Sequence, residues 1–219
     1  MVEGQDMDLF TLKMIGIVTM FLDHYNYIIG GPEIFDILGR MAFPIFAFAL
    51  VEGYKHTRNI HKYLFRIGIS AILFQIPAQI LGYNETLNIF FTLFLGLTCI
   101  YICDRFNIYI SGVLSISVII LAVVIKADYG VYGMLLIICF YLGRDSRYIR
   151  MAVPLLLNIW LYFLPRLFGM EKIQVYSILA LIPIYFYNGK KGRDMKYLFY
   201  IFYPAHFVIL ELVRRIIGR

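Results

Sequence analysis

Long apolar runs separated by short polar stretches cover almost the whole chain. Most runs are close to the ~20 residues that a helix needs to cross ~30 Å of hydrocarbon, but the sixth, 129–142, is short and could form one re-entrant unit with the fifth. We predict about nine transmembrane helices, within a range of eight to ten, in a single all-α membrane bundle over residues 1–219. Their expected spans are 9–29, 34–53, 62–82, 87–103, 107–126, 129–142, 149–165, 173–188 and 196–217. Barrel strands do not fit, because polar and apolar residues do not alternate.

The composition excludes a soluble domain and a disordered chain. Hydrophobic residues make up 61% and charged residues 16% of the 219 positions, against about 45–50% and about 25% in soluble domains. The mean hydropathy is +0.77, whereas disorder requires low hydrophobicity and high charge. The lipid bilayer is therefore the first expected partner.

The net charge of +6 comes from Lys and Arg residues that cluster between apolar runs. Loops of membrane proteins show this pattern, and no nucleic-acid-binding motif accompanies it, so we expect no nucleic-acid partner. With the N-terminus in the cytoplasm, the expected topology places thirteen of the twenty basic residues on the inner side and seven on the other. Because membrane proteins keep positive loops inside, this orientation is favoured.

Ionisable side chains interrupt the first two apolar runs. Lys13 and His24 are eleven residues apart, close to three helical turns, and so share one helix face. Asp23 precedes His24, and the second run carries Arg40 and Glu52. A charge at bilayer depth costs at least about 2.5–3.5 kcal/mol, which makes these residues functional candidates.

A Gly-Gly-Pro turn folds the two runs into a hairpin. The hairpin brings Asp23 and His24 level with Arg40, and Lys13 level with Glu52, as two polar layers. A histidine beside a carboxylate can act as a general base, and an arginine can stabilise a developing oxyanion. A structural ion pair that holds the two helices together explains the spacing equally well.

The segment 54–66 follows the second run and is basic. Its side chains suited to phosphate binding are Lys55, Thr57, Arg58 and Arg66. An ordinary positive inner loop has the same composition. His56 and His61 are five residues apart, which is not a helical metal-ligand spacing, and we expect no metal.

Later runs carry isolated polar residues. Tyr203 and His206 form a patch in the last run, where His206 either lines a site or packs as a satisfied histidine. Asn88 and Thr92 are four apart and share a helix face. They either line the same cavity or bond to neighbouring helices.

With these motifs in place, the sequence resembles the TraX family, membrane proteins named for the acetylase that N-acetylates conjugative pilin. The matching blocks run in order along nearly the whole chain. They are Leu12–Lys13, Met20–His24, Gly39–Phe48, Glu52–Asn59, Leu87–Leu93, Ala127–Gly133 and Phe199–His206. The most specific are Gly-Arg-x-Ala-Phe-Pro and Glu-Gly-Tyr-x-x-Thr-Arg-Asn.

The resemblance extends to a wider group of transmembrane acyltransferases, which share a basic residue followed, after ten others, by a histidine. Lys13 and His24 match that spacing. The resemblance implies that His24 is catalytic, with Asp23 and Arg40 beside it, and that acetyl-CoA enters from the cytosol as co-substrate. It implies a bacterial cytoplasmic membrane. It also favours phosphate binding by Lys13 and by the basic segment, and it adds Asp128 to the expected cavity lining.

We therefore expect an acetyl-CoA-dependent membrane acetyltransferase. The acceptor is expected to be an amine or hydroxyl of a pilin-like peptide, a glycan or a lipid. One rival is a transporter or channel, in which buried charges form a solute path. Another is a non-enzymatic assembly or immunity protein whose polar residues only pack helices.

Overall fold

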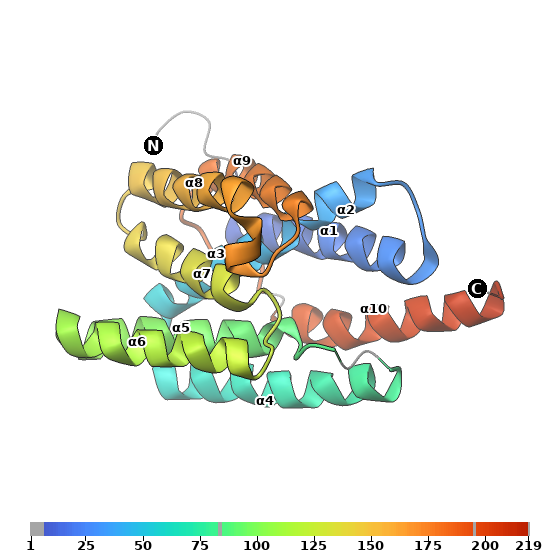
Figure 1. Ribbon diagram of the computed structural model, residues 1–219, viewed down its shortest axis with the longest axis horizontal. Coiled ribbons are helices and arrows are strands. Elements are labelled where there is room, and N and C mark those ends of the chain that lie inside the picture. Colours follow the sequence, from blue (N-terminus) through green and yellow to red (C-terminus); the bar gives the residue numbers. More distant parts are fainter. Residues whose placement is uncertain (1–6, 83–84, 195, 219) are drawn as a thin grey trace. The chain divides into compact units, whose positions relative to one another are not determined.

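The computed structural model describes residues 7–82, 85–194 and 196–218, and within them every regular element is a helix (Figure 1). The α-helices are α1 (Leu9–Ile29), α2 (Ile34–Gly39), α3 (Ala42–His56), α4 (Ile60–Ile80), α5 (Ile89–Arg105), α6 (Ile108–Val124), α7 (Gly130–Leu142), α8 (Arg147–Phe163), α9 (Leu181–Tyr185) and α10 (Lys196–Ile216). Two 3₁₀ helices, η1 (Pro165–Phe168) and η2 (Lys172–Ala180), precede α9. The all-helical fold class is confirmed.

The helices pack into two compact units. Unit 1 comprises the described residues of Met1–Ala49 and Lys172–Arg219, and unit 2 comprises those of Leu50–Glu171. The boundary falls within α3. Compact packing within each unit does not decide whether residues 1–219 form one membrane domain, and that stays a prediction.

Short polar side chains determine where several helices begin. Asp8, before α1, accepts a hydrogen bond from the backbone N–H of Thr11 at 2.8 Å. Such an acceptor satisfies one of the N–H groups that a helix start leaves unpaired. The equivalent caps of α4, α5, α6 and α8 are Asn59, Asn88, Asn107 and Ser146. These caps place the helix starts within three residues of the predicted ones.

The apolar run predicted as one helix over 34–53 contains a break, which separates α2 from α3 at Arg40 and Met41. Pro44 causes it, because proline has no N–H with which to bond the Arg40 carbonyl, and its ring clashes with that carbonyl. The N–H of Met41 bonds instead to the carbonyl of Leu38, at 3.1 Å. The sequence-based prediction missed this break.

The run predicted over 173–188 is helical but mostly not α-helical. It forms η2 and then the five residues of α9. Pro183 lacks the N–H that would bond to Leu179, which limits the α-helical segment. The tighter 3₁₀ geometry is usually confined to short pieces. The helical stretch Lys172–Tyr185 has fewer than the ~20 residues that a membrane-spanning α-helix needs.

In unit 1, α1 packs against α2 and α10, and α2 also packs against η2. The N-terminal residues before α1 bond to the segment that follows α9. The N–H of Leu9 bonds to the carbonyl of Lys190 at 2.9 Å, and the N–H of Asn188 bonds to the carbonyl of Met7 at the same distance. The start of α1 is therefore tied to the segment between α9 and α10 within this unit.

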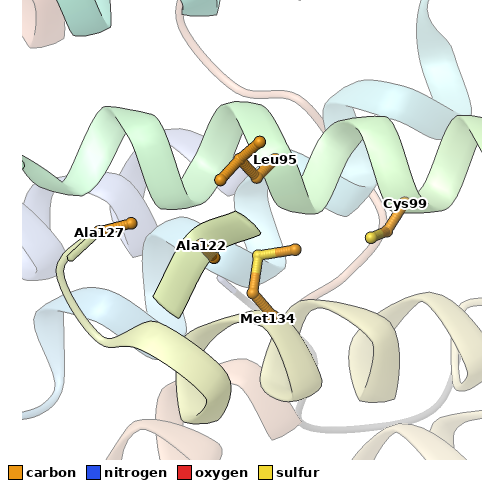
Figure 2. Packing of buried hydrophobic residues seen from close by; sticks show 5 residues of the cluster. All are labelled: Leu95, Cys99, Ala122, Ala127 and Met134. Carbon is orange, nitrogen blue, oxygen red and sulfur yellow. The ribbon is translucent and has the colours of Figure 1, made fainter. Parts of the chain in front are cut away.

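In unit 2, α5 packs against α4, α6 and α7, and α7 packs against α8. Helices α4, α5 and α6 lie side by side with their axes roughly aligned, and the chain reverses direction from each to the next (Figure 1). Figure 2 shows buried side chains from this unit that meet in one cluster. They are Leu95, Cys99, Ala122, Ala127 and Met134. Small residues in such a cluster let helix backbones approach closely, which is how helices associate in lipid.

Two helical stretches among the described residues are long and apolar enough to cross a membrane, Ile34–His56 and Ile60–Ile80. Large apolar side chains are exposed along α4 and α6. On α4 they are Phe65, Ile69, Ile72, Leu73, Ile76 and Ile80. Apolar surface of this extent is typical of helices that face lipid. A membrane location is supported; the full number of spans and the orientation of the N-terminus stay predictions.

Candidate functional site

An ion pair joins α1 to the break between α2 and α3. The Arg40 guanidinium donates a hydrogen bond to the Asp23 carboxylate, and the two side chains are 23% and 18% exposed. Asp23 and Arg40 were predicted from the hairpin to lie level, and this contact is confirmed. Nearby, Asn26 donates to the Asp36 carboxylate at 2.7 Å. Because the pair is partly desolvated, removing either partner leaves a costly unpaired charge.

A glycine lets α2 approach α1 closely enough for this pair. A Cβ atom at Gly39 would lie 2.5 Å from the Cβ of Asp23, closer than real Cβ atoms come. Gly39 itself is buried. The Gly-Arg dipeptide in the sequence therefore provides both the room for the contact and the charge that makes it.

Gln174, on η2, extends this polar layer. Its Oε1 lies 3.4 Å from an Nη atom of Arg40, and the residue is only 2% exposed. Its Nε2 is buried and has no hydrogen-bond partner in the described part of the chain. The sequence-based prediction did not include Gln174, although an amide inside an apolar run was a visible signal.

The two histidines of unit 1 form a direct contact. Nδ1 of His24, on α1, lies 2.6 Å from Nε2 of His206, on α10. The two rings are stacked with centroids 4.8 Å apart and an interplanar angle of 16°. His206 is 2% exposed. The sequence suggested each histidine separately and did not predict that they meet.

The hydrogen bonds of the pair determine its proton positions. Nδ1 of His206 lies 2.8 Å from the carbonyl oxygen of Phe202, which only accepts, so this nitrogen must carry a hydrogen. In the neutral ring, Nε2 of His206 is then an acceptor, and Nδ1 of His24 must donate to it. The remaining nitrogen of His24, Nε2, keeps a lone pair. The arrangement thus presents His24 in the tautomer that a general base requires.

Aromatic rings surround the imidazole pair. The Phe202 ring is parallel to His206, with centroids 4.8 Å apart, and the Phe207 ring lies 4.5 Å from His24. Tyr203, a predicted cavity residue, contacts His206 edge-on at 5.9 Å. These rings restrict rotation of both imidazoles, which keeps their hydrogen bonds aligned.

The second predicted layer involves both units. Lys13, in unit 1, has its Nζ 5.1 Å from the centroid of the Phe199 ring, a cation–π distance. Glu52, in unit 2, is buried, and its carboxylate lies 3.6 Å from Nε2 of His56. The pairing of Lys13 with Glu52 stays a prediction.

The basic segment 54–66, which begins in the last turn of α3, lines a cavity of about 420 Å³ in unit 2. Its polar lining includes Lys55, Thr57, Arg58, Asp104, Arg144 and Asp145. Three of the four residues predicted in this segment to bind phosphates are therefore together at one site. The fourth, Arg66, lies over the ring of Tyr63 at 5.0 Å.

Some charged side chains of this cavity have partners within the protein, whereas Arg58 has none among the described residues. Lys55 Nζ lies 3.3 Å from a carboxylate oxygen of Asp145. The Asp104 carboxylate accepts hydrogen bonds from Tyr54, at 2.5 Å, and from Tyr141. Arg58 is exposed and has no side-chain partner among the described residues. Its guanidinium is therefore available to an anionic ligand.

Other predicted cavity residues make structural bonds in unit 2. The side chain of Asn88 caps α5 by accepting from Phe90 N–H at 3.0 Å, and it donates to the carbonyl of Ala71 at 2.8 Å. The Thr92 hydroxyl donates to the backbone carbonyl of Asp128. These contacts match the alternative in which such residues bond to neighbouring helices.

Sequence reasoning missed Arg144 and Asp104 as parts of the basic cavity. Both lie near helix ends, where charged residues are ordinary, so composition gave no reason to choose them. Only the packing of α5 and α7 in unit 2 brings them beside the segment after α3. Arg144 is further oriented by the Tyr141 ring, 4.0 Å from its guanidinium carbon.

These features define a class: a helical protein with membrane-type apolar surfaces that carries an oriented histidine pair and a basic cavity. Residues 8–214 match the family profile described as TraX protein, and the chain belongs to this family. It is 29% identical over 233 aligned positions to the probable fimbrial assembly protein FimC, serogroup H1, of Dichelobacter nodosus. The match covers 94% of this chain and 95% of that protein. No solved structure shows a significant match.

Proposed function

We propose that this protein is a membrane-embedded acetyltransferase that moves an acetyl group from acetyl-CoA to an amine or hydroxyl of an acceptor. The observation that carries the proposal is the hydrogen-bond chain from the Phe202 carbonyl through His206 to His24. With both rings neutral, this chain selects the tautomer of His24 that has a lone pair on Nε2. A group so oriented is suited to take a proton from an attacking nucleophile.

In the proposed reaction, the acceptor nitrogen or oxygen attacks the thioester carbon while Nε2 of His24 takes its proton. The C=O electron pair moves onto oxygen and forms a tetrahedral oxyanion. When this collapses, the C=O bond forms again and the C–S bond breaks. The sulfur leaves with the electron pair and receives the proton from His24. The products are the acetylated acceptor and CoA thiol.

Asp23 and Arg40 are proposed to organise this site. Their ion pair fixes the end of α1 against the break between α2 and α3. Since Asp23 directly precedes His24, this contact limits the positions that the His24 backbone can take. The positive charge of Arg40 is largely balanced by Asp23, which supports an ordering role for Arg40 more than sole stabilisation of an oxyanion.

The basic cavity is proposed to bind the phosphates of CoA. Lys55, Arg58 and Arg144 contribute three cations, and the Thr57 hydroxyl contributes a hydrogen-bonding group. Guanidinium groups match phosphate geometry well. Acetyl-CoA suits this cavity because its phosphates are anionic. Entry from the cytosol agrees with the proposed N-terminus-inside topology.

The acceptor is proposed to be a fimbrial or pilin-type subunit. The relative from Dichelobacter nodosus is named as a fimbrial assembly protein. Acetylation of such a subunit would be a membrane step in making the fibre. A glycan or lipid acceptor remains an outcome of the test below.

The test uses inverted membrane vesicles that contain this protein and a co-expressed fimbrial subunit, supplied with [¹⁴C]acetyl-CoA. We expect label in the subunit, at its N-terminus or a hydroxyl side chain, and none in vesicles without the protein. Label in the glycan or lipid fraction would keep the acetyltransferase and change the acceptor. Absence of protein-dependent label from every fraction would refute the function.

A non-enzymatic assembly role is the second candidate, because the relative's name states assembly and no chemistry. In that role, the histidine pair would only join α1 to α10. A His24→Gln variant that still supports fibre assembly fully would favour this candidate. A transporter predicts a third result, with no thermal stabilisation by CoA.

A further inference from the structure

A buried amide on η2 has hydrogen-bonding capacity that the described protein does not use. Gln174 is 2% exposed, and its Nε2 carries two N–H donors without an acceptor in the described part of the chain. An unpaired buried donor costs about 1–3 kcal/mol. Proteins keep few such groups, and those they keep often have a functional reason.

The neighbouring arginine fixes which end of the amide is unpaired. Gln174 Oε1 lies 3.4 Å from an Nη atom of Arg40, and a guanidinium group only donates. Turning the amide over would place N–H donors against N–H donors. Arg40 therefore holds the carbonyl oxygen of Gln174, and the amide N–H groups are left without an acceptor among the described residues.

We propose that the side-chain amide of Gln174 binds the carbonyl oxygen of the acyl group and stabilises the oxyanion formed during transfer. This inference rests on the proposed function and adds a residue to it. The oxygen of a thioester carbonyl accepts hydrogen bonds and gains negative charge when the nucleophile attacks. A buried donor already held in place stabilises that charge without reorganising.

The surroundings favour this acceptor over a permanent anion. Arg40 pairs with Asp23, so the polar layer carries little net charge to hold an anion. A neutral amide suits an oxygen that is neutral in the ground state and charged only transiently. Gln174 connects through Arg40 to Asp23, the residue beside His24. The donor and the base thus belong to one connected set of side chains in unit 1.

Two substitutions at Gln174 distinguish stabilisation of the oxyanion from a role in which Gln174 only holds the Arg40 side chain in place. Gln174→Met removes both the acceptor and the donors, whereas Gln174→Glu keeps an oxygen for Arg40 and removes the donors. Tyr176→Phe, at an exposed position on the same helix, is the matched control. We expect both Gln174 variants to lower kcat about 10²–10³-fold with little change in KM for acetyl-CoA, and the control to behave as wild type. A Gln174→Glu variant with wild-type kcat would overturn the proposal.

A second readout does not depend on turnover. Infrared spectra of bound [1-¹³C]acetyl-CoA should show the thioester C=O stretch lowered in wild type and in Tyr176→Phe, and restored to its solution position in Gln174→Met. Binding without this difference would reject the Gln174 inference and leave the acetyltransferase intact. If wild type does not bind acetyl-CoA, both the inference and the proposed function fail. Matched melting temperatures check that the variants are folded.

Discussion

At the residue scale, the contact between His24 and His206 changes how the second histidine is understood. From sequence, His206 was either a satisfied packing histidine or a residue that lines a site. In the structure it accepts the hydrogen bond that sets the tautomer of His24 and is itself held by the Phe202 carbonyl. The two histidines therefore act as one unit, and their substitutions should not behave independently.

We predict that His206→Ala lowers kcat for acetyl transfer by a smaller factor than His24→Ala. Without His206, the imidazole of His24 remains but loses the partner that orients it. The double variant should be no slower than His24→Ala alone, because positioning has no value once the base is gone. Single-turnover rates of the three variants test this. Multiplicative losses in the double variant would show that the histidines act separately.

Gly39 gives a prediction about packing. Gly39→Ala should lower the free energy of unfolding by about 1–3 kcal/mol, because the added methyl group overlaps Asp23 and forces α2 away from α1. Gly112→Ala on α6 is the matched control, since a Cβ there meets nothing within 4 Å. It should be neutral or stabilising by up to about 1 kcal/mol. Unfolding in mixed detergent micelles compares the two variants. Equal stabilities would contradict the close approach of Gly39 to Asp23.

At the element scale, the helix boundaries follow from caps and prolines. The runs of apolar residues were sufficient to predict α1, α4, α5, α6, α7, α8 and α10 within a few residues. Hydropathy carries no information about single missing N–H groups, so the effects of Pro44 and Pro183 were overlooked. The break at Arg40 is functionally relevant because it lies where the side chain pairs with Asp23.

The cap of α1 predicts a dependence of stability on pH. The hydrogen bond from Thr11 N–H lowers the pKa of the exposed Asp8 carboxyl below its ordinary value. Since the folded pKa is below the unfolded one, this contribution is complete above the unfolded pKa and is lost as pH falls through the folded pKa. Asp8→Ala should therefore cost at most about 1 kcal/mol at neutral pH.

The cost of Asp8→Ala should shrink on acidification through the range in which aspartate titrates. Asp8→Asn keeps a capping oxygen that does not titrate, so its stability should lack this acid-dependent step. Free energies of unfolding for wild type and both variants, measured in detergent from neutral to acidic pH, provide the comparison. A constant difference between wild type and Asp8→Ala over the whole range would show that the carboxylate does not stabilise the helix.

At the scale of the whole molecule, the fold class was predictable because the length of an apolar run is a local property of the sequence. The Asp23–Arg40 contact was predictable for a similar reason, since the two runs are joined by a short turn. The His24–His206 contact and the approach of Gln174 to Arg40 were not, because they join residues more than 130 positions apart. The basic cavity was partly predictable: its contiguous segment was found, and its distant contributors were missed.

The basic cavity leads to a prediction about CoA. Lys55→Gln and Arg58→Gln should raise KM for acetyl-CoA with a smaller effect on kcat, because they remove phosphate contacts and leave the base in place. Affinity for CoA should also fall as salt is added. Lys126→Gln makes the same charge change elsewhere in unit 2 and should have no such effect. CoA is titrated against all three variants. If Lys55→Gln and Arg58→Gln bind CoA as tightly as wild type does, this cavity is excluded as the phosphate site.

The most direct test of histidine-based acetyl transfer compares purified wild type with His24→Ala in two assays, CoA binding and transfer of [¹⁴C]acetyl. As the proposed base, His24 should be dispensable for binding and required for transfer. We predict unchanged CoA affinity and a loss of about 10²–10⁴-fold in the transfer rate. A His24→Ala protein that transfers acetyl at the wild-type rate would contradict histidine-based acyl transfer in this protein.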